Sequence, residues 1–151
     1  MKDEVMTVED IVVEGSSTEG GVISVWTLNR PDKLNALNVD SHRAIKEASA
    51  RANSDDSVRC VVIRGAPPPE AEDGKRPKPQ AFAAGADISE FAGKDSDGVR
   101  PFFEDNGWEA VWNICKPTIA MVDGFALGCL LYTSDAADEG LGVDLGGRRI
   151  I

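Results

Sequence analysis

The sequence has little of what cross-links, metal sites or membrane insertion require. Its three cysteines, Cys60, Cys115 and Cys129, are odd in number and show no CxxC spacing, which argues against a disulfide framework or a zinc site. No apolar run approaches the ~18 residues of a membrane span. The start, "MKDEVMTVED", lacks the apolar core of a secretory signal. These absences argue against a disulfide-stapled secreted protein and a membrane protein, and they favour a reducing cytoplasm.

Positive charge is also scarce. The 16 Lys and Arg residues stand against 26 Asp and Glu residues, so the formal net charge is −10. A globally acidic protein repels phosphate backbones, which argues against non-specific nucleic-acid binding. The length of 151 residues is that of one domain.

What the sequence does contain is an alternation of strand-like and helix-like segments. Residues 5–13 and 22–28 favour β-structure and are predicted to pair as a hairpin. Asn38 is predicted to cap a helix that runs to about Ala52. The run "VRCVVIRG" (58–65) is typical of a strand covered on both faces. This alternation predicts an α/β domain.

The segments that follow are more varied. Residues 66–80, "APPPEAEDGKRPKPQ", are predicted to be a Pro-rich charged surface loop, with a docking role as the less favoured alternative. A short strand, a glycine turn and a helix start follow in 81–91. A further helix is predicted from near Val99, with "TIAMV" (118–122) as a buried strand. The helix is expected to bury a stripe formed by Trp108, Val111, Trp112 and Cys115.

Two glycine turns indicate chemistry. "AAGAD" (83–87) and "GFALG" (124–128) each follow an apolar strand. Small side chains let a ligand lie against the backbone. Two backbone N–H groups aimed at one carbonyl oxygen form an oxyanion hole, which holds the negative charge that develops on a thioester. The pair of turns therefore predicts a carbonyl-binding site.

The sequence resembles a known family in the order and spacing of four segments, which are "LNRPDKLNALN" (28–38), "VRCVVIRG" (58–65), "AFAAGADISEF" (81–91) and "KPTIAMVDGFALG" (116–128). The resemblance is to the crotonase superfamily, and within it to the enoyl-CoA hydratases. The resemblance covers about residues 5–128, roughly the N-terminal half of a family domain. It implies an α/β fold, a crotonase-like ββα spiral truncated after about half of the domain. It also implies an acyl-CoA thioester as substrate, with coenzyme A as part of that substrate and no separate cofactor or metal. A homo-trimer or hexamer is expected of the full-length parent, but not of this fragment, and no nucleic-acid or membrane partner is expected.

The resemblance also implies roles for individual residues. The N–H of Ala84 would be one oxyanion donor, and the second would fall at Cys129, where the family has a glycine. Lys33 and Ala36 would contact the coenzyme A moiety. The other residues expected to bind substrate are Gly85, Ala86, Asp87, Ile88 and Gly128. For Lys33 the alternative is an exposed surface lysine, and for Asp87 it is an acid in the first turn of a helix.

Residues 129–151 depart from the family pattern. Tyr132 stands where hydratases have their first catalytic glutamate, and the second would fall at or past Ile151. The segment resembles translated sequencing-adapter sequence. Residues 1–128 are therefore expected to form the N-terminal part of a crotonase-like domain, with 66–80 as an insertion and 129–151 as a non-native or disordered tail.

The expected function is that of an enoyl-CoA hydratase-type protein that adds water to a 2-enoyl-CoA in its full-length parent, with this chain an inactive fragment. One alternative keeps the fold but changes the reaction, to an isomerase, a dehalogenase or an acyl-CoA thioester hydrolase. Another is a non-catalytic CoA-binding module. A serine-nucleophile hydrolase is less favoured, because the single histidine, His42, is far in sequence from both turns.

Overall fold

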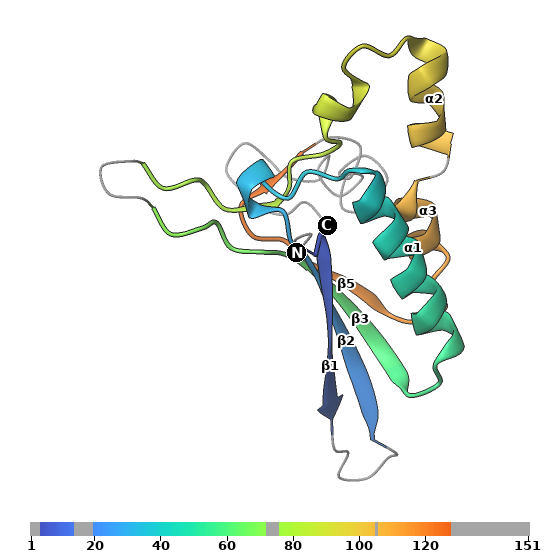
Figure 1. Ribbon diagram of the computed structural model, residues 1–151. Helices are drawn as coiled ribbons and strands as arrows, with labels where there is room; N and C mark the ends of the chain where they lie inside the picture. The colour runs from blue at the N-terminus through green and yellow to red at the C-terminus, as the bar shows by residue number, and fades with distance from the viewer. Residues whose placement is uncertain (1–3, 14–19, 72–75, 105, 128–151) are drawn as a thin grey trace, which may run out of the picture.

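The structure, a computed structural model, describes residues 4–13, 20–71, 76–104 and 106–127. Its largest element is a four-stranded sheet in the order β1-β2-β3-β5 (Figure 1). The strands are β1 (Met6–Val13), β2 (Gly21–Leu28), β3 (Val58–Gly65) and β5 (Thr118–Met121). β1 and β2 pair antiparallel, as the sequence predicts, whereas β2–β3 and β3–β5 are parallel.

One helix, α1 (Val39–Ser54), covers one face of this sheet (Figure 1). The predicted cap is confirmed, because Asn38 Oδ1 accepts a hydrogen bond from the Ser41 N–H at 2.9 Å. On its buried face, Ile45 packs in one cluster with Trp26 and other residues of the sheet. Trp26 is 1% exposed and is the largest fully buried side chain.

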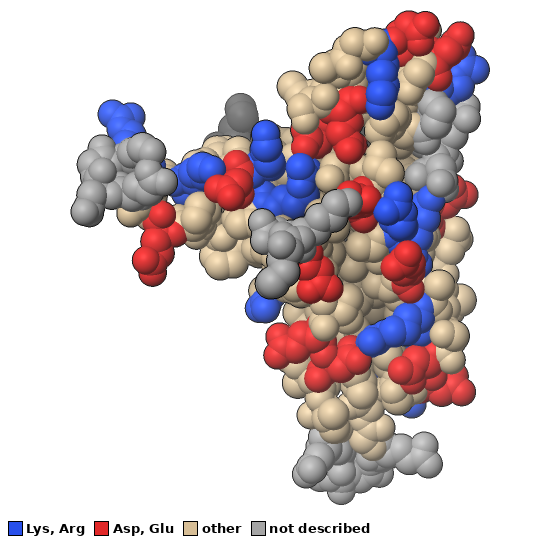
Figure 2. Space-filling model, in the orientation of Figure 1, with Lys and Arg blue, Asp and Glu red and all other residues tan. Residues whose placement is uncertain are grey.

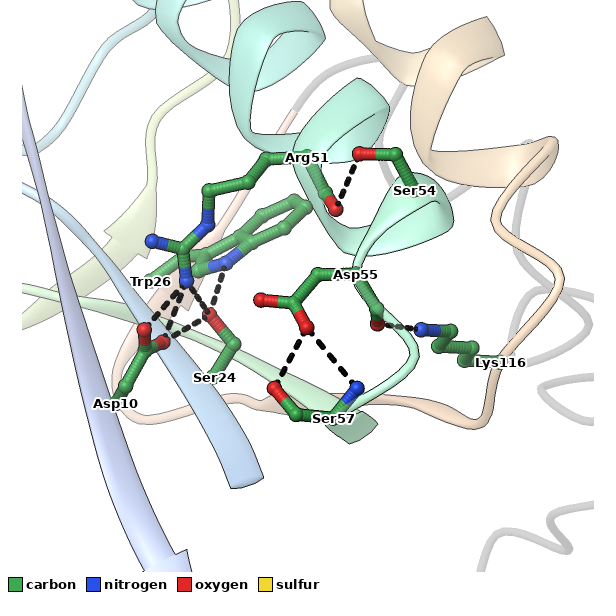
Figure 3. Close-up of polar contacts among 8 residues, drawn as sticks. All are labelled: Asp10, Ser24, Trp26, Arg51, Ser54, Asp55, Ser57 and Lys116. Atoms are coloured by element: carbon green, nitrogen blue, oxygen red, sulfur yellow. Dashed lines mark hydrogen bonds and ion pairs between the residues drawn. The ribbon is translucent and has the colours of Figure 1, made fainter. Parts of the chain in front are cut away.

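Polar contacts fasten the C-terminal end of α1 to the sheet (Figure 3). Arg51 forms an ion pair with Asp10 of β1, with 2.6 Å between Nη2 and Oδ2. This guanidinium holds the pKa of the Asp10 carboxyl below its ordinary value. The Ser24 hydroxyl donates to Asp10 and accepts from the indole N–H of Trp26, so the buried indole is satisfied. Just past the helix, Lys116 donates to the carbonyl of Asp55.

A second, two-stranded parallel sheet pairs β4 (Ala81–Ala83) with β6 (Phe125–Ala126). The 3-10 helix η1 (Pro31–Lys33) precedes β4 in sequence, and the 3-10 helix η2 (Ile88–Phe91) lies between β4 and β6. This small sheet places the strands that precede and enter the two glycine turns next to each other.

The single helix expected from near Val99 is instead two helices, α2 (Ser96–Glu104) and α3 (Gly107–Trp112). The expected buried stripe is also wrong, because Trp112 is 70% exposed and Cys115 is exposed. α3 starts afresh at its own cap, Asn106, and ends before Cys115. The side chains that pack against the core from this region are Trp108, Val111 and Ile114.

Burial of the strands also differs from expectation. In β3, Val61 and Ile63 are buried but Val62 between them is only partly so, and all four residues of β5 are exposed. Among the described residues, α1 packs on one face of the sheet and β5 is an edge strand. The apolar composition of these strands predicted that other elements would cover both faces of the sheet. Among the described residues, only one face is covered. No helix within the described ranges is long and apolar enough to cross a membrane.

Candidate active site

The connection between β2 and α1 is organised by one buried side chain. Asn35, 2% exposed, adopts a left-handed backbone (φ 55°) after η1. Its Oδ1 accepts from the Arg30 N–H at 3.0 Å. Its Nδ2 donates to the carbonyl of Ala66 at 3.0 Å and to that of Ala81 at 2.8 Å. Asn35 therefore holds together the two ends of the Pro-rich 66–80 segment.

The same connection runs beside the first glycine turn. The Ala84 N–H donates to the Leu34 carbonyl at 3.0 Å. The Leu37 N–H donates to the Gly85 carbonyl at 2.8 Å, and the Asp87 N–H returns a bond to the Leu37 carbonyl at 2.8 Å. These bonds form a parallel bridge between Leu37 and Ala86. The connection between β2 and α1 therefore holds the turn in place through these hydrogen bonds. Gly85 in the turn has φ 93°, a backbone conformation that residues with a side chain rarely adopt.

The N–H groups of the turn differ in what they bind. The Ala84 N–H, the expected oxyanion donor, is occupied by the Leu34 carbonyl. Within the described part of the chain, no group accepts from the N–H of Gly85 or of Ala86. Gly85 is buried, whereas Ala86 is partly exposed. Ala86 is therefore the residue of this turn whose unpaired N–H is more accessible to a ligand.

The second glycine turn lies against the first. The Leu127 N–H donates to the Ala83 carbonyl at 2.9 Å, and the Phe125 N–H donates to the Gln80 carbonyl at 3.0 Å. Gly124 (φ 76°) permits this approach, since a Cβ there would lie 2.1 Å from the Gln80 oxygen. The two turns, distant in sequence, therefore approach each other. Gly128 and Cys129, which were expected to complete the second turn, lie outside the described residues.

Asp87, an expected pocket residue, has structural partners. Its Oδ1 caps η2 by accepting from the Ser89 N–H at 3.1 Å and the Ser89 hydroxyl at 2.6 Å. Its Oδ2 lies 2.7 Å from Nη2 of Arg30. The Ser89 hydroxyl, and then Arg30, outweigh burial and lower the pKa of Asp87 from 3.8 to about 2. The carboxylate therefore serves as the N-cap of η2 and as an ion-pair partner, whereas the acid in the first turn of η2 is Glu90.

The other described residues that were expected to bind substrate differ in how far they are exposed. Ala36 is 9% exposed and its carbonyl accepts from Arg30. Lys33 is exposed in η1, and Ile88 is 79% exposed. Arg30 was not singled out from the sequence, although it stands directly before Pro31.

Positive side chains lie close to this site in an otherwise acidic protein. The described parts of 66–80 contain no helix or strand and form an arm that projects from the body (Figure 1). Figure 2 shows Lys and Arg side chains along this arm and at its base. Lys78 of the arm contacts Asp32 of η1, with 2.8 Å between Nζ and Oδ1. Asp32 directly precedes Lys33 in the sequence. Within the described ranges, no group of His, Cys, Asp and Glu side chains is arranged to hold a metal ion.

The fold is that of the crotonase class. An enoyl-CoA hydratase from Bacillus anthracis superposes with a TM-score of 0.64 at 26% identity, covering 84% of this chain and 43% of that one. Pseudomonas aeruginosa DspI superposes with a TM-score of 0.63 at 26% identity, covering 84% of this chain and 46% of that one. The enoyl-CoA hydratase/isomerase family model matches residues 23–130. The chain belongs to this family.

The relatives that this chain matches are named as different enzymes. A probable enoyl-CoA hydratase from Rhizobium meliloti (strain 1021) is 42% identical over 124 residues, which cover 82% of this chain and 42% of the relative. A carboxymethylproline synthase from Pectobacterium carotovorum subsp. carotovorum is 38% identical over 121 residues, covering 78% of this chain and 43% of the relative. This chain therefore spans less than half the length of these relatives.

Proposed function

We propose that this chain forms the part of an enoyl-CoA hydratase that receives the thioester carbonyl of an acyl-CoA. The observation that carries the proposal is the 84–87 turn, which is braced by three backbone hydrogen bonds and leaves the Ala86 N–H without a partner among the described residues. A preorganised N–H of this kind stabilises negative charge developing on a carbonyl oxygen. The occupied N–H of Ala84 favours Ala86 as the donor in its place.

Hydration is the reaction proposed for a complete protein that contains this sequence. Relatives named enoyl-CoA hydratase support it, including the one from Rhizobium meliloti. Adding water across a double bond also needs positioned acid–base groups, each worth on the order of 10²–10⁴ in rate. Tyr132 stands at the expected place of one such group and lies outside the described residues. We therefore propose that the 151-residue chain alone does not turn over crotonyl-CoA. The proposed compartment is a reducing cytoplasm.

The reaction is tested by the loss of enoyl absorbance. The purified 151-residue chain is compared with a version in which residues after 127 are replaced by the corresponding C-terminal part of the Rhizobium meliloti relative. We expect turnover by the completed version only. Full turnover by the chain alone would contradict its proposed inactivity. A folded completed version that releases free thiol from acyl-CoA without hydrating the enoyl group would favour the thioester hydrolase alternative.

The donor assignment is tested by replacing single amides with esters in the completed version. An ester at Ala86 deletes one N–H and leaves the side chain unchanged, and it also makes the Gly85 carbonyl a weaker acceptor for the Leu37 N–H. We expect turnover to fall by about 10²–10³ with a small decrease in the melting midpoint. The matched control is an ester at Ala84, which removes the bond to Leu34 and is expected to lower the melting midpoint more than the Ala86 ester does. The reverse pattern would restore Ala84 as the donor.

A further inference from the structure

Arg30 joins the two segments that form the candidate site. Its Nη1 donates to the Ala36 carbonyl at 2.6 Å, and its Nη2 contacts Asp87 Oδ2 at 2.7 Å. The side chains of Arg30 and Asp87 are only 18% and 8% exposed. This pair is therefore much better shielded from solvent than the surface pairs of the chain, such as Arg43 with Asp40 at 62% and 46%.

The two contacts of Arg30 bracket the bridge between the segments. Ala36 directly precedes Leu37, and Asp87 directly follows Ala86, and Leu37 and Ala86 are the bridged pair. One planar guanidinium thus spans the connection and the turn at the peptide whose N–H is unpaired. A guanidinium presents its donors in a rigid fork, whereas a lysine ammonium is a compact point charge on a flexible stem. Lysine at this position would reach one acceptor at a time.

We propose that Arg30 is the positioning residue of the carbonyl-binding turn, which sets the orientation of the Ala86 peptide through its two contacts with Ala36 and Asp87. The inference that the oriented group is a carbonyl donor rests on the function proposed above. The bracing of the turn by Arg30 does not depend on it.

The remaining contacts of Asp87 show why the turn needs this brace. Without Arg30, the buried carboxylate keeps only the cap bonds to Ser89. A buried charge that loses its partner is strongly destabilising. Movement of the carboxylate towards water would relieve that cost. Asp87 is joined to the turn through its own N–H bond to Leu37. Movement of the carboxylate would therefore open that bond and rotate the neighbouring Ala86 peptide.

The first experiment measures amide hydrogen exchange in the 151-residue chain without ligand. In Arg30→Met and Arg30→Lys we expect the Leu37 and Asp87 amides to exchange at least about 10-fold faster, while β2 and β3 amides keep their protection. Arg43→Met, which removes an exposed i,i+3 pair, is the matched control and should change neither set. Unchanged exchange at Leu37 and Asp87, or an equal increase throughout the sheet, would overturn the proposal.

The second experiment uses 2,4-hexadienoyl-CoA, whose absorption shifts to the red when its carbonyl accepts a hydrogen bond. We expect the unaltered chain to bind it with a red shift, and Arg30→Lys to bind with a dissociation constant changed less than about 3-fold but with a smaller shift. An undiminished shift in Arg30→Lys would overturn the positioning role. If neither the unaltered chain nor the completed version binds this probe, the proposed function fails, and exchange at Leu37 and Asp87 alone decides whether Arg30 braces the turn.

Discussion

Gly65 closes β3 at the point where the backbone of β4 passes. A Cβ at this position would lie 2.3 Å from the Ala81 oxygen, 2.6 Å from the Phe82 oxygen and 2.8 Å from Asn35 Nδ2. The first two are backbone atoms, and the third belongs to a side chain with every amide donor in use. The site therefore has no flexible neighbour that could move aside.

Gly65→Ala is accordingly expected to lower the free energy of unfolding by about 1–3 kcal/mol, the usual range for overpacking. Urea denaturation measures it. The control is Gly98→Ala in α2, where an added Cβ would approach the Asp95 and Lys94 side chains at 3.3 Å. That substitution should be neutral or stabilising, since alanine favours helix over glycine. Equal losses at the two positions would contradict this account.

The Asp87 carboxyl makes stability depend on pH. Its pKa is about 2 in the folded protein, below the ordinary value of 3.8, so the folded state favours the charged form. The resulting stabilisation is fully present above about pH 4 and is lost as the pH falls towards 2. A difference of this size corresponds to about 2 kcal/mol. Between pH 5 and pH 2, Asp87→Asn should therefore lose less stability than the unaltered chain by about that amount. Asp97→Asn, at an exposed position, should follow the unaltered chain; if Asp87→Asn also does, the carboxyl is not the source.

Single residues were predictable from the sequence only where their partners are near in the chain. Asn38 could be recognised as a cap because it binds Ser41. Asn35 and Arg30 could not, because their partners at Ala81 and Asp87 come from the far side of the 66–80 insertion. A left-handed asparagine with four polar contacts has no local sequence signature. The glycine turn itself was recognised, but which of its N–H groups is free depends on Leu34 and Leu37.

At the scale of elements, the 66–80 arm is attached at its ends. Asn35 joins Ala66 to Ala81, and Lys78 contributes one exposed ion pair with Asp32. Exposed pairs contribute about 0–1 kcal/mol. Replacing residues 67–79 with a short glycine-containing turn should therefore change the free energy of unfolding by less than about 1 kcal/mol.

The matched variant is Asn35→Ala with the arm intact. It leaves two buried carbonyls without their donor, each worth roughly 1–3 kcal/mol, and should be clearly more destabilising than removal of the arm. Thermal or urea denaturation of both variants measures the difference. A loss above about 2 kcal/mol on removing the arm would show that it packs on the body.

The presence of a helix or strand was easier to predict from the sequence than the burial of its side chains. The β1–β2 hairpin, α1 and β3 were all expected from composition and caps, and each lies where the sequence placed it. The exposure of β5 and of Trp112 was not expected, because apolar composition predicts burial without saying which layer provides it. The break between α2 and α3 was missed because the predicted stripe begins only at Trp108, after the Asn106 cap at which α3 starts afresh.

At the scale of the whole molecule, half of the exposed large apolar side chains among the described residues lie on or near the edge strand β5 and the small sheet. They are Trp112, Ile119, Met121, Val122, Phe125 and Leu127, each between 48% and 70% exposed. Apolar patches of this kind promote association, and an open strand edge adds unpaired backbone groups. We therefore expect the purified chain to self-associate at micromolar concentrations and to bind a hydrophobic dye.

Ile119→Lys is expected to reduce both effects, since a charge on an edge strand discourages pairing with another chain. Sedimentation velocity and dye fluorescence measure them. Val39→Lys, which replaces an exposed apolar residue of α1 that is 40% exposed, is the control and should leave both unchanged. Equal reductions by the two variants would mean that net charge, rather than this edge, governs association.

The strand order also sets the order in which the strands pair during synthesis of the chain. β1 and β2 are joined by a short connection and pair from Val13 with Gly21, so their contact forms early. β5 reaches its place only when Thr118 pairs with Val61, after the arm, α2 and α3 have been synthesised. Because contacts between distant segments form slowly, β3 spends an interval on the ribosome with one edge unpaired. During that interval the edge of β3 presents unpaired backbone groups with which another chain can pair, and slowing translation across the arm would lengthen its exposure.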